Sequence, residues 1–233
     1  MNNDKYLVVT SKPWNINAFN DLIKHFEGKW HLITDSDNLT VDKILKLQPK
    51  YIFFPHWSEL VPDEILNLST CICFHETDLP FGRGGSPIQN LIANGYKSTY
   101  ITAIKMTSKI DSGPIYLKKK LSLEGLAEEI YIRASKIVAQ MISSIINDDI
   151  TPHRQTGDVS YFKRRNPNQS EVPKNIDSVE DLFDHIRMLD AESYPRAFIV
   201  SNGFKFEITR PSLKSHELLA DIRITKLKKE TED

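Results

Sequence analysis

Cys71-Ile-Cys-Phe-His75 is an apolar run that ends in a histidine, and the loop Glu76-Thr-Asp-Leu-Pro-Phe-Gly-Arg-Gly-Gly-Ser-Pro87 follows it directly. The run predicts a buried strand, and open α/β sheets bind ligands at the carboxyl ends of their strands. We therefore expect His75 in a ligand crevice. Asp111, which comes later in the chain, could orient the imidazole, and the pair could perform acid–base catalysis. Spacing alone leaves a second interpretation open, in which the two side chains never meet.

The chain before this run alternates between apolar segments and helical patterns. Strands are expected at residues 5–10, 30–34, 51–55 and 71–74, and helices at residues 19–26 (capped by Asn15 or Asn17), 41–47 and 63–68. This β-α-β-α order favours an α/β fold with a Rossmann-like, mostly parallel sheet. The Gly-x-Gly-x-x-Gly loop of dinucleotide-binding folds is missing from the sequence, which argues against a NAD cofactor.

The chain after the run continues the same domain. Ser86-Pro87 predicts the start of a helix that stops at Asn94-Gly95. Two further strands are expected at residues 99–106 and 113–117, followed by a long amphipathic helix over residues 122–146.

The residues of the opening stretch resemble the signature of the 10-formyltetrahydrofolate-dependent formyltransferases. The matching positions are His75, Leu79-Pro80, Arg83-Gly84, Pro87 and Asp111-x-Gly113. The loop from residue 77 to 87 is most similar to nucleotide-sugar N-formyltransferases, including those of pseudaminic-acid pathways, and to the formylation domain of linear gramicidin synthetase. The resemblance is clear over residues 1–150 and looser beyond them. It implies a formyltransferase fold and an N-formyltransferase activity.

The resemblance also implies catalytic roles for particular residues. His75 would move protons and Asp111 would hold its ring. The family pattern is Asn-x-His, in which the asparagine stabilises the oxyanion, but Cys73 occupies that position here. A thiol is a weak donor, and loss of an oxyanion donor typically costs about 100- to 1000-fold in rate. Either another donor replaces the asparagine, or the chemistry depends more on His75, or the chain is a decayed sugar-nucleotide binder.

Binding residues follow from the same resemblance. The formyl donor would be 10-formyltetrahydrofolate, whose pterin would dock on Glu59-Leu60-Val61 and on Thr107-Ser108-Lys109-Ile110-Asp111. The alternative for Leu60 and Val61 is packing at a helix entry.

Three residues are candidates for contacting the acceptor: Lys12, Trp14 and Arg83. The alternatives are core packing for Trp14 and a surface turn for Arg83. The acceptor expected from the resemblance is the amine of a UDP- or dTDP-linked 4-amino-4,6-dideoxy sugar, as used for surface polysaccharide or flagellin glycans.

The composition of the chain limits the classes of partner that we expect. Thirty basic and 31 acidic residues give a formal net charge of −1, which offers no electrostatic case for a nucleic-acid partner. The apolar runs are shorter than the roughly 20 residues of a membrane span, and the first residues lack a signal-peptide pattern, so we expect a cytoplasmic protein. The rival acceptors are methionyl-tRNA and a carrier-bound aminoacyl group. A homodimer is also considered.

The two cysteines, Cys71 and Cys73, share one face of the expected strand with His75. Cys-x-Cys-x-His invites a metal interpretation, but zinc sites usually need four ligands at wider spacing. We favour buried thiols and expect no metal.

Domain boundaries follow from composition. Residues 1–150 are expected to form the catalytic domain, residues 151–175 a linker rich in proline and polar residues, and residues 176–233 a small C-terminal α+β subdomain with a tail. Within the subdomain, Ser178 and Asp181 predict a helix start, and Asn202-Gly203 predicts the turn of a β-hairpin. Residues 213–233 are expected to be a solvated tail.

Overall fold

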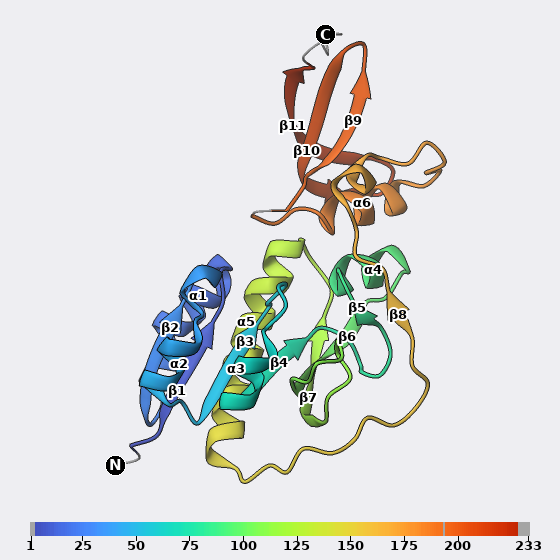
Figure 1. Ribbon diagram of the computed structural model, residues 1–233. Coiled ribbons are helices and arrows are strands. Elements are labelled where there is room, and N and C mark those ends of the chain that lie inside the picture. The colour runs from blue at the N-terminus through green and yellow to red at the C-terminus, as the bar shows by residue number, and fades with distance from the viewer. Residues whose placement is uncertain (1–2, 193, 228–233) are drawn as a thin grey trace. The chain divides into compact units, whose positions relative to one another are not determined.

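The computed structural model describes residues 3–192 and 194–227. The chain divides into two compact units, which are described separately (Figure 1). The first comprises Met1–Pro87, Ser98–Ser122 and Tyr131–Lys163, and the second comprises Ile88–Lys97, Leu123–Ile130 and Arg164–Asp233.

A six-stranded sheet forms the first unit. Its strand order is β2 (Lys29–Ile33), β1 (Lys5–Val9), β3 (Tyr51–Pro55), β4 (Thr70–His75), β6 (Ser98–Lys105) and β7 (Ile115–Ser122). Only β6 runs against the other strands of this sheet, because β4 and β7 both pair with it in antiparallel register. The prediction of a Rossmann-like, mostly parallel α/β sheet is confirmed.

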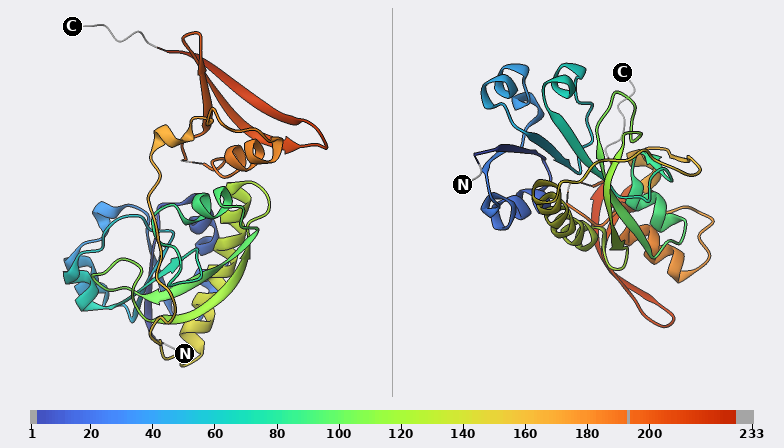
Figure 2. Two further views of the ribbon diagram at one scale, coloured as in Figure 1. Left: turned by 90° about the vertical axis from the view of Figure 1, so that its right-hand side faces the viewer. Right: turned by 90° about the horizontal axis from the view of Figure 1, so that it is seen from below.

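Helices cover both faces of this sheet. α2 (Val41–Leu47) and α3 (Asp63–Leu68) lie on one face, and α1 (Pro13–Asp21) and most of α5 (Ala127–Asn147) lie on the other (Figure 2). Between the sheet and the first pair is an apolar cluster made of Leu7, Val9, Ile33, Ile44, Ile52, Phe54, Val61, Ile65 and Cys71. Burying the side chains of such a cluster typically stabilises a fold by about 1.5–3 kcal/mol each. Two short 3₁₀ helices, η1 (Ile23–His25) and η2 (Ser36–Asn38), also belong to this unit, whereas all but the first residue of α4 (Pro87–Ala93) belongs to the second unit.

The expected start of the first helix is wrong. α1 begins at Pro13, and Asn15 is buried inside the helix rather than capping it. Its amide nitrogen donates to the Thr10 hydroxyl at 3.3 Å and to the Pro55 carbonyl at 3.2 Å, so it ties the ends of β1 and β3 together. Pro13 explains the earlier start, because its fixed φ suits the first helical position and it has no N–H to satisfy there.

The expected end of the last strand is also wrong. β7 continues to Ser122 through three lysines, Lys118 to Lys120, and α5 begins only at Ala127. β7 lies at the edge of the sheet. Lysines on an edge strand discourage pairing with another chain, which explains why a charged run is compatible with a strand here.

The segment predicted as a linker takes part in the fold of the first unit. β8 (Tyr161–Phe162) pairs in parallel with β5 (Arg83–Gly84), and His153 bridges to Ile115. The glycine-rich loop after His75 is therefore held by residues from far along the chain.

The second unit contains η3 (Pro167–Ser170), α6 (Val179–Arg187) and a three-stranded antiparallel sheet in the order β11-β10-β9. The Ser178 hydroxyl accepts from the Asp181 amide at 3.0 Å and caps α6. β9 (Ala197–Ser201) and β10 (Phe204–Leu213) form the predicted hairpin. Asn202 and Gly203 have φ values of 50° and 77°, as a two-residue type I′ turn requires.

The prediction of a solvated tail is wrong for the described part of that segment. β11 (Leu218–Lys226) pairs with β10 along its length. Apolar residues alternate with polar ones from Ala220 to Thr225, which is typical of a strand, but the charged end of the chain led to the prediction of a tail. Residues 228–233 lie outside the described part of the chain. No helix within the described ranges has the length and apolar character needed to cross a membrane.

Candidate active site

The structure brings His75 and Asp111 together. His75 is the last residue of β4 and exposes only 7% of its surface. Its Nδ1 lies 3.6 Å from Oδ2 of Asp111, which sits in the loop between β6 and β7 with a φ of 49°. The Gly84 amide donates to the same Oδ2 at 2.8 Å. The glycine-rich loop therefore fixes the carboxylate beside the imidazole.

The other nitrogen of His75 also has a partner. Nε2 lies 2.8 Å from the carbonyl oxygen of Gly82. A carbonyl can only accept, so Nε2 carries a proton in this arrangement and donates it. His75 thus presents a proton donor to the loop that follows it.

Cys73 lies two residues before His75 in β4 and is a free thiol. Burial raises its pKa well above the usual range, and the nearby carboxylates of Asp111 and Glu76 raise it further. Burial also raises the pKa of Cys71 to about 12. Both thiols therefore stay protonated near neutral pH, and neither has the thiolate that nucleophilic attack requires.

A second pair of titratable groups, which the sequence analysis did not identify, lies beside His75. Glu76 follows His75 and is buried, and its Oε1 lies 3.8 Å from Nδ1 of His56. Burial raises the pKa of Glu76 to about 7 and, with the charge of Lys12, lowers the pKa of His56 to about 3. The imidazole of His56 is therefore neutral, and its contact with Glu76 is not an ion pair at neutral pH.

Aromatic rings pack against His56 of this pair. Trp14 stacks on Tyr131 of α5 with ring centroids 4.7 Å apart, and His56 meets the Tyr131 ring edge-on at 4.6 Å. Trp14 is only 5% exposed. Its indole is thus largely occupied by packing, while Lys12 lies near enough to His56 to affect its pKa. A contact of either residue with the acceptor stays a prediction.

Arg83 contacts a residue that the sequence analysis placed in a linker. Its Nε and Nη2 donate to Oε1 of Gln155 at 3.3 and 2.6 Å. The amide nitrogen of Gln155 donates in turn to the carbonyl oxygens of Asp111 and Gly113, at 2.8 and 2.9 Å. Gln155 therefore joins Arg83 to the loop that carries Asp111. The sequence offers no signal for Gln155, because its partners lie 72 and 44 residues away.

The two segments expected to bind the pterin, residues 59–61 and 107–111, each come shortly after a residue that packs on the apolar cluster between the sheet and α2 and α3. These residues are Trp57 and Met106. Val61 belongs to the cluster itself, as the packing interpretation expected, whereas Leu60 is 83% exposed and Ile110 is 63% exposed. A contact of either side chain with the pterin stays a prediction. The other expected contacts, Glu59, Thr107, Ser108 and Lys109, are exposed.

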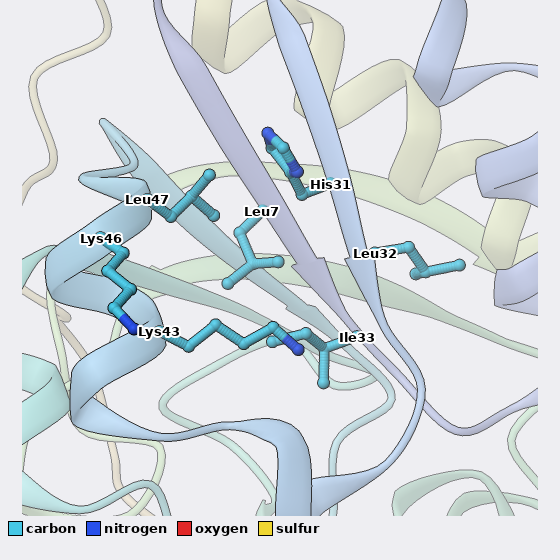
Figure 3. A pocket seen from close by; sticks show the side chains of 7 residues that line it. All are labelled: Leu7, His31, Leu32, Ile33, Lys43, Lys46 and Leu47. Carbon is cyan, nitrogen blue, oxygen red and sulfur yellow. The ribbon is translucent and has the colours of Figure 1, made fainter.

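Metal binding has no support in the described residues, where three His, Cys, Asp or Glu side chains nowhere gather in a metal-binding group. A separate pocket of about 290 Å³ lies between β1, β2 and α2 (Figure 3). It is lined by Leu7, His31, Leu32, Ile33, Lys43, Lys46 and Leu47 and shares none of these residues with the site around His75.

Two protein-family models match this chain. The model described as Formyl transferase matches residues 15–142, which contain His75, Asp111 and the loop between them. The model described as Methionyl-tRNA formyltransferase, C-terminal domain, matches residues 167–225.

Individual proteins agree with these matches. A methionyl-tRNA formyltransferase structure from Clostridium thermocellum is 45% identical, covers 96% of this chain and 99% of its own, and superposes with a TM-score of 0.92. A curated methionyl-tRNA formyltransferase from Thermodesulfovibrio yellowstonii is 28% identical over 65% of this chain and 51% of its own length.

This chain spans about half the length of the first curated relatives it matches. A sugar N-formyltransferase from Shewanella sp FDAARGOS_354, at 17% identity with 89% and 97% of the two chains covered, shares the fold with a TM-score of 0.69. The chain belongs to the formyl transferase family.

Proposed function

We propose that this chain transfers a formyl group from 10-formyltetrahydrofolate to the α-amino group of methionyl-tRNA. The observation that carries the proposal is the His75–Asp111 pair, which the Gly84 amide holds at the end of β4. The acceptor is suggested by the name of the C. thermocellum relative and by the names of the curated relatives. The donor is supported by the fold, because HypX from Aquifex aeolicus, with a TM-score of 0.73, was solved in complex with tetrahydrofolic acid.

This proposal replaces the sequence-based prediction of a nucleotide-sugar acceptor without a nucleic-acid partner, which is wrong. The finding that overturns it is the set of methionyl-tRNA formyltransferases among the relatives, one of them 45% identical over nearly the whole chain. The expected role in surface polysaccharide or flagellin glycans is withdrawn with it. A net charge of −1 is a sum over the chain, so it says nothing about where cations cluster.

The reaction exchanges one C–N bond for another. The acceptor's ammonium group must lose a proton before its nitrogen can attack the formyl carbon. The new C–N bond forms, the carbonyl oxygen becomes an oxyanion, and collapse breaks the bond between the formyl carbon and N10 of the folate, which takes up a proton. His75 would donate a proton in this sequence, since its Nε2 carries one, and Asp111 would hold the ring.

The site residues fit this chemistry in distinct roles. Leu60, Ile110 and the backbone of residues 107–111 would receive the pterin. Cys73 would line the site as a neutral thiol. Arg83 is engaged by Gln155, so we assign it to positioning the Asp111 loop rather than to an anion.

The direct test is an acceptor assay. The protein is incubated with 10-formyltetrahydrofolate and methionyl-tRNA, and N-formylmethionine released from the tRNA is quantified by mass spectrometry. Uncharged tRNA, free methionine and a reaction without folate are the controls. We expect formylation of methionyl-tRNA only. Formylation of small amines or carrier-bound aminoacyl groups with none on methionyl-tRNA would contradict the assignment of the acceptor.

A further inference from the structure

His75 alone does not account for both proton transfers that the reaction needs, from the acceptor's ammonium group and to N10 of the folate. In the structure, Nε2 of His75 donates to the Gly82 carbonyl, and Nδ1 faces Asp111. The ring is therefore arranged as a proton donor, which suits the departure of N10. The acceptor's ammonium group still needs a base, because an amine that retains all three protons has no lone pair for attack.

Glu76 is placed to fill that role. It directly follows His75, the last residue of β4, and His56 likewise directly follows β3, the parallel neighbour of β4. Its carboxylate lies 3.8 Å from Nδ1 of His56, which is longer than a hydrogen bond, and accepts a hydrogen bond from its own backbone amide. The side chain is 11% exposed. Glu76 thus combines burial at the end of β4 with a carboxylate that, within the described part of the chain, no other side chain holds at hydrogen-bond distance.

We propose that Glu76 is the base that takes the proton from the acceptor's ammonium group, while His75 supplies the proton to the leaving nitrogen. This assignment of the two proton transfers rests on the formyl-transfer activity proposed above. It gives a role to a residue outside the His75–Asp111 pair.

The groups around Glu76 set its pKa near the value that a base for the acceptor needs. Burial is the largest influence and raises its pKa to about 7, although the charge of His75 and the hydrogen bond from its own backbone amide lower it; the charge of Asp111 adds to the rise. The neutral imidazole of His56 and the protonated thiol of Cys73 add no net charge. An α-amino group ordinarily has a pKa of about 7.7–8.0, so base and substrate are closely matched, which favours proton transfer near neutral pH.

Protons balance over the cycle. The ammonium group gives one proton to the Glu76 carboxylate, and the amine attacks the formyl carbon. The nitrogen of the tetrahedral intermediate still carries one proton more than the amide product. His75 protonates N10 as the C–N10 bond breaks. The deprotonated His75 then takes the excess proton from the acceptor nitrogen. Glu76 then releases its proton to solvent. The products are a neutral formamide and tetrahydrofolate, with one proton set free.

The test compares Glu76→Gln with the wild type across pH. At about pH 7, where the acceptor is largely an ammonium ion, we expect the variant to lose at least ~100-fold in formyl transfer. Above about pH 9 the acceptor is already a free amine, so the deficit should shrink to less than ~10-fold. Glu64→Gln, an exposed residue of α3, is the matched control and should follow the wild type at every pH.

Two outcomes would overturn the proposal: turnover within about twofold of the wild type at pH 7, or a loss of the same size at every pH. The second outcome would indicate a structural role. If Glu76→Gln does not fold, Glu76→Asp replaces it, because aspartate keeps a carboxylate but places it one methylene group closer to the backbone. A pH-dependent loss with Asp supports the base, and a pH-independent loss contradicts it.

The acceptor used in the test separates this inference from the proposed function. Should the wild type fail to formylate methionyl-tRNA, glycinamide at high concentration replaces it as a simple primary amine. A pH-dependent deficit of Glu76→Gln with glycinamide would support Glu76 as the base while the tRNA assignment fails. Equal pH profiles for wild type and variant would overturn the role of Glu76 whichever acceptor is used.

Discussion

Single residues decide how much of the chemistry this site can perform. His75 and Asp111 are 36 residues apart in sequence, yet their side chains meet at 3.6 Å. Cys73 stands where the family pattern has an asparagine, and burial keeps its thiol protonated. In the proposed mechanism the oxyanion would therefore lack a strong side-chain donor at this position, and the Nε2 proton of His75 would become more important.

Replacing either member of the catalytic pair should reveal its role. We expect His75→Ala and Asp111→Asn each to lower formyl transfer by at least ~100-fold, because acid–base groups typically contribute that much. Turnover with saturating formyl donor and a far-ultraviolet circular dichroism spectrum measure activity and folding separately. Near-wild-type turnover in either variant would refute the assigned roles.

Replacing Cys73 tests the missing oxyanion donor. Cys73→Ser should stay active, because a buried thiol with a raised pKa is not the nucleophile. Cys73→Asn should be faster than the wild type, by up to the ~100-fold that an oxyanion donor can supply. Initial rates with both variants and mass spectrometry of the protein check this. Loss of activity with Ser, together with a formyl adduct on Cys73, would point instead to covalent catalysis.

At the scale of elements, the site depends on a loop that distant segments hold in place. β8 pairs with β5 in the glycine-rich loop, and Gln155, a few residues before β8, links Arg83 to the carbonyl oxygens of Asp111 and Gly113. The segment that looked like a linker thus supports the active-site loop. Its hydrogen bonds hold the backbone on which Asp111 stands.

Removing the Gln155 contacts should therefore affect turnover more than folding. We expect Gln155→Ala to lower kcat by about 10- to 100-fold, because small misplacements of catalytic groups are costly. Gln155→Glu keeps an acceptor for Arg83 but cannot donate to the two carbonyl groups, so it should resemble Ala. Steady-state kinetics measure both variants.

Gln140→Ala, on the exposed side of α5, is the matched control and should behave as the wild type. A wild-type kcat in Gln155→Ala would show that the Asp111 loop does not need this support.

For the whole molecule, the buried pair Glu76 and His56 links stability to pH in opposite directions. The pKa of Glu76 is raised to about 7, so the native state keeps a proton that the unfolded state loses above about pH 4.5, and stability falls as pH rises through this range. The pKa of His56 is lowered to about 3, so the unfolded state binds a proton first, and stability falls as pH drops below about 6.5.

Each variant should remove one of these dependences. Relative to the wild type, Glu76→Gln should gain stability from pH 4.5 to 7, by up to about 3 kcal/mol at 1.36 kcal/mol per pKa unit. His56→Asn, which tolerates the positive φ at this position, should gain relative to the wild type as pH falls below 6.5. Urea unfolding followed by tryptophan fluorescence reports on the first unit, which holds all three tryptophans. Curves that stay parallel to the wild type would contradict the pKa shifts.

Local chemistry was enough to predict much of this protein. The parallel strands, the turn at Asn202-Gly203, the cap at Ser178 and the position of His75 at a strand end follow from apolar patterning and turn propensities between near neighbours in the chain. The motif from His75 to Asp111 also predicted the formyl transferase family. The acceptor could not be predicted from the sequence in this way, because the net charge of the chain and the similarity of one loop do not determine which substrate an enzyme binds.

Only the tertiary structure decided the contacts between distant residues. Gln155 binds Arg83 and the Asp111 loop, which lie 72 and 44 residues away in the sequence. The charged end of the sequence suggested a tail where the structure has β11, which pairs with β10. Glu76 looks like one more loop acid in the sequence. Its pKa of about 7 comes from burial near His56 and His75, and burial is a property of the packed fold rather than of local sequence.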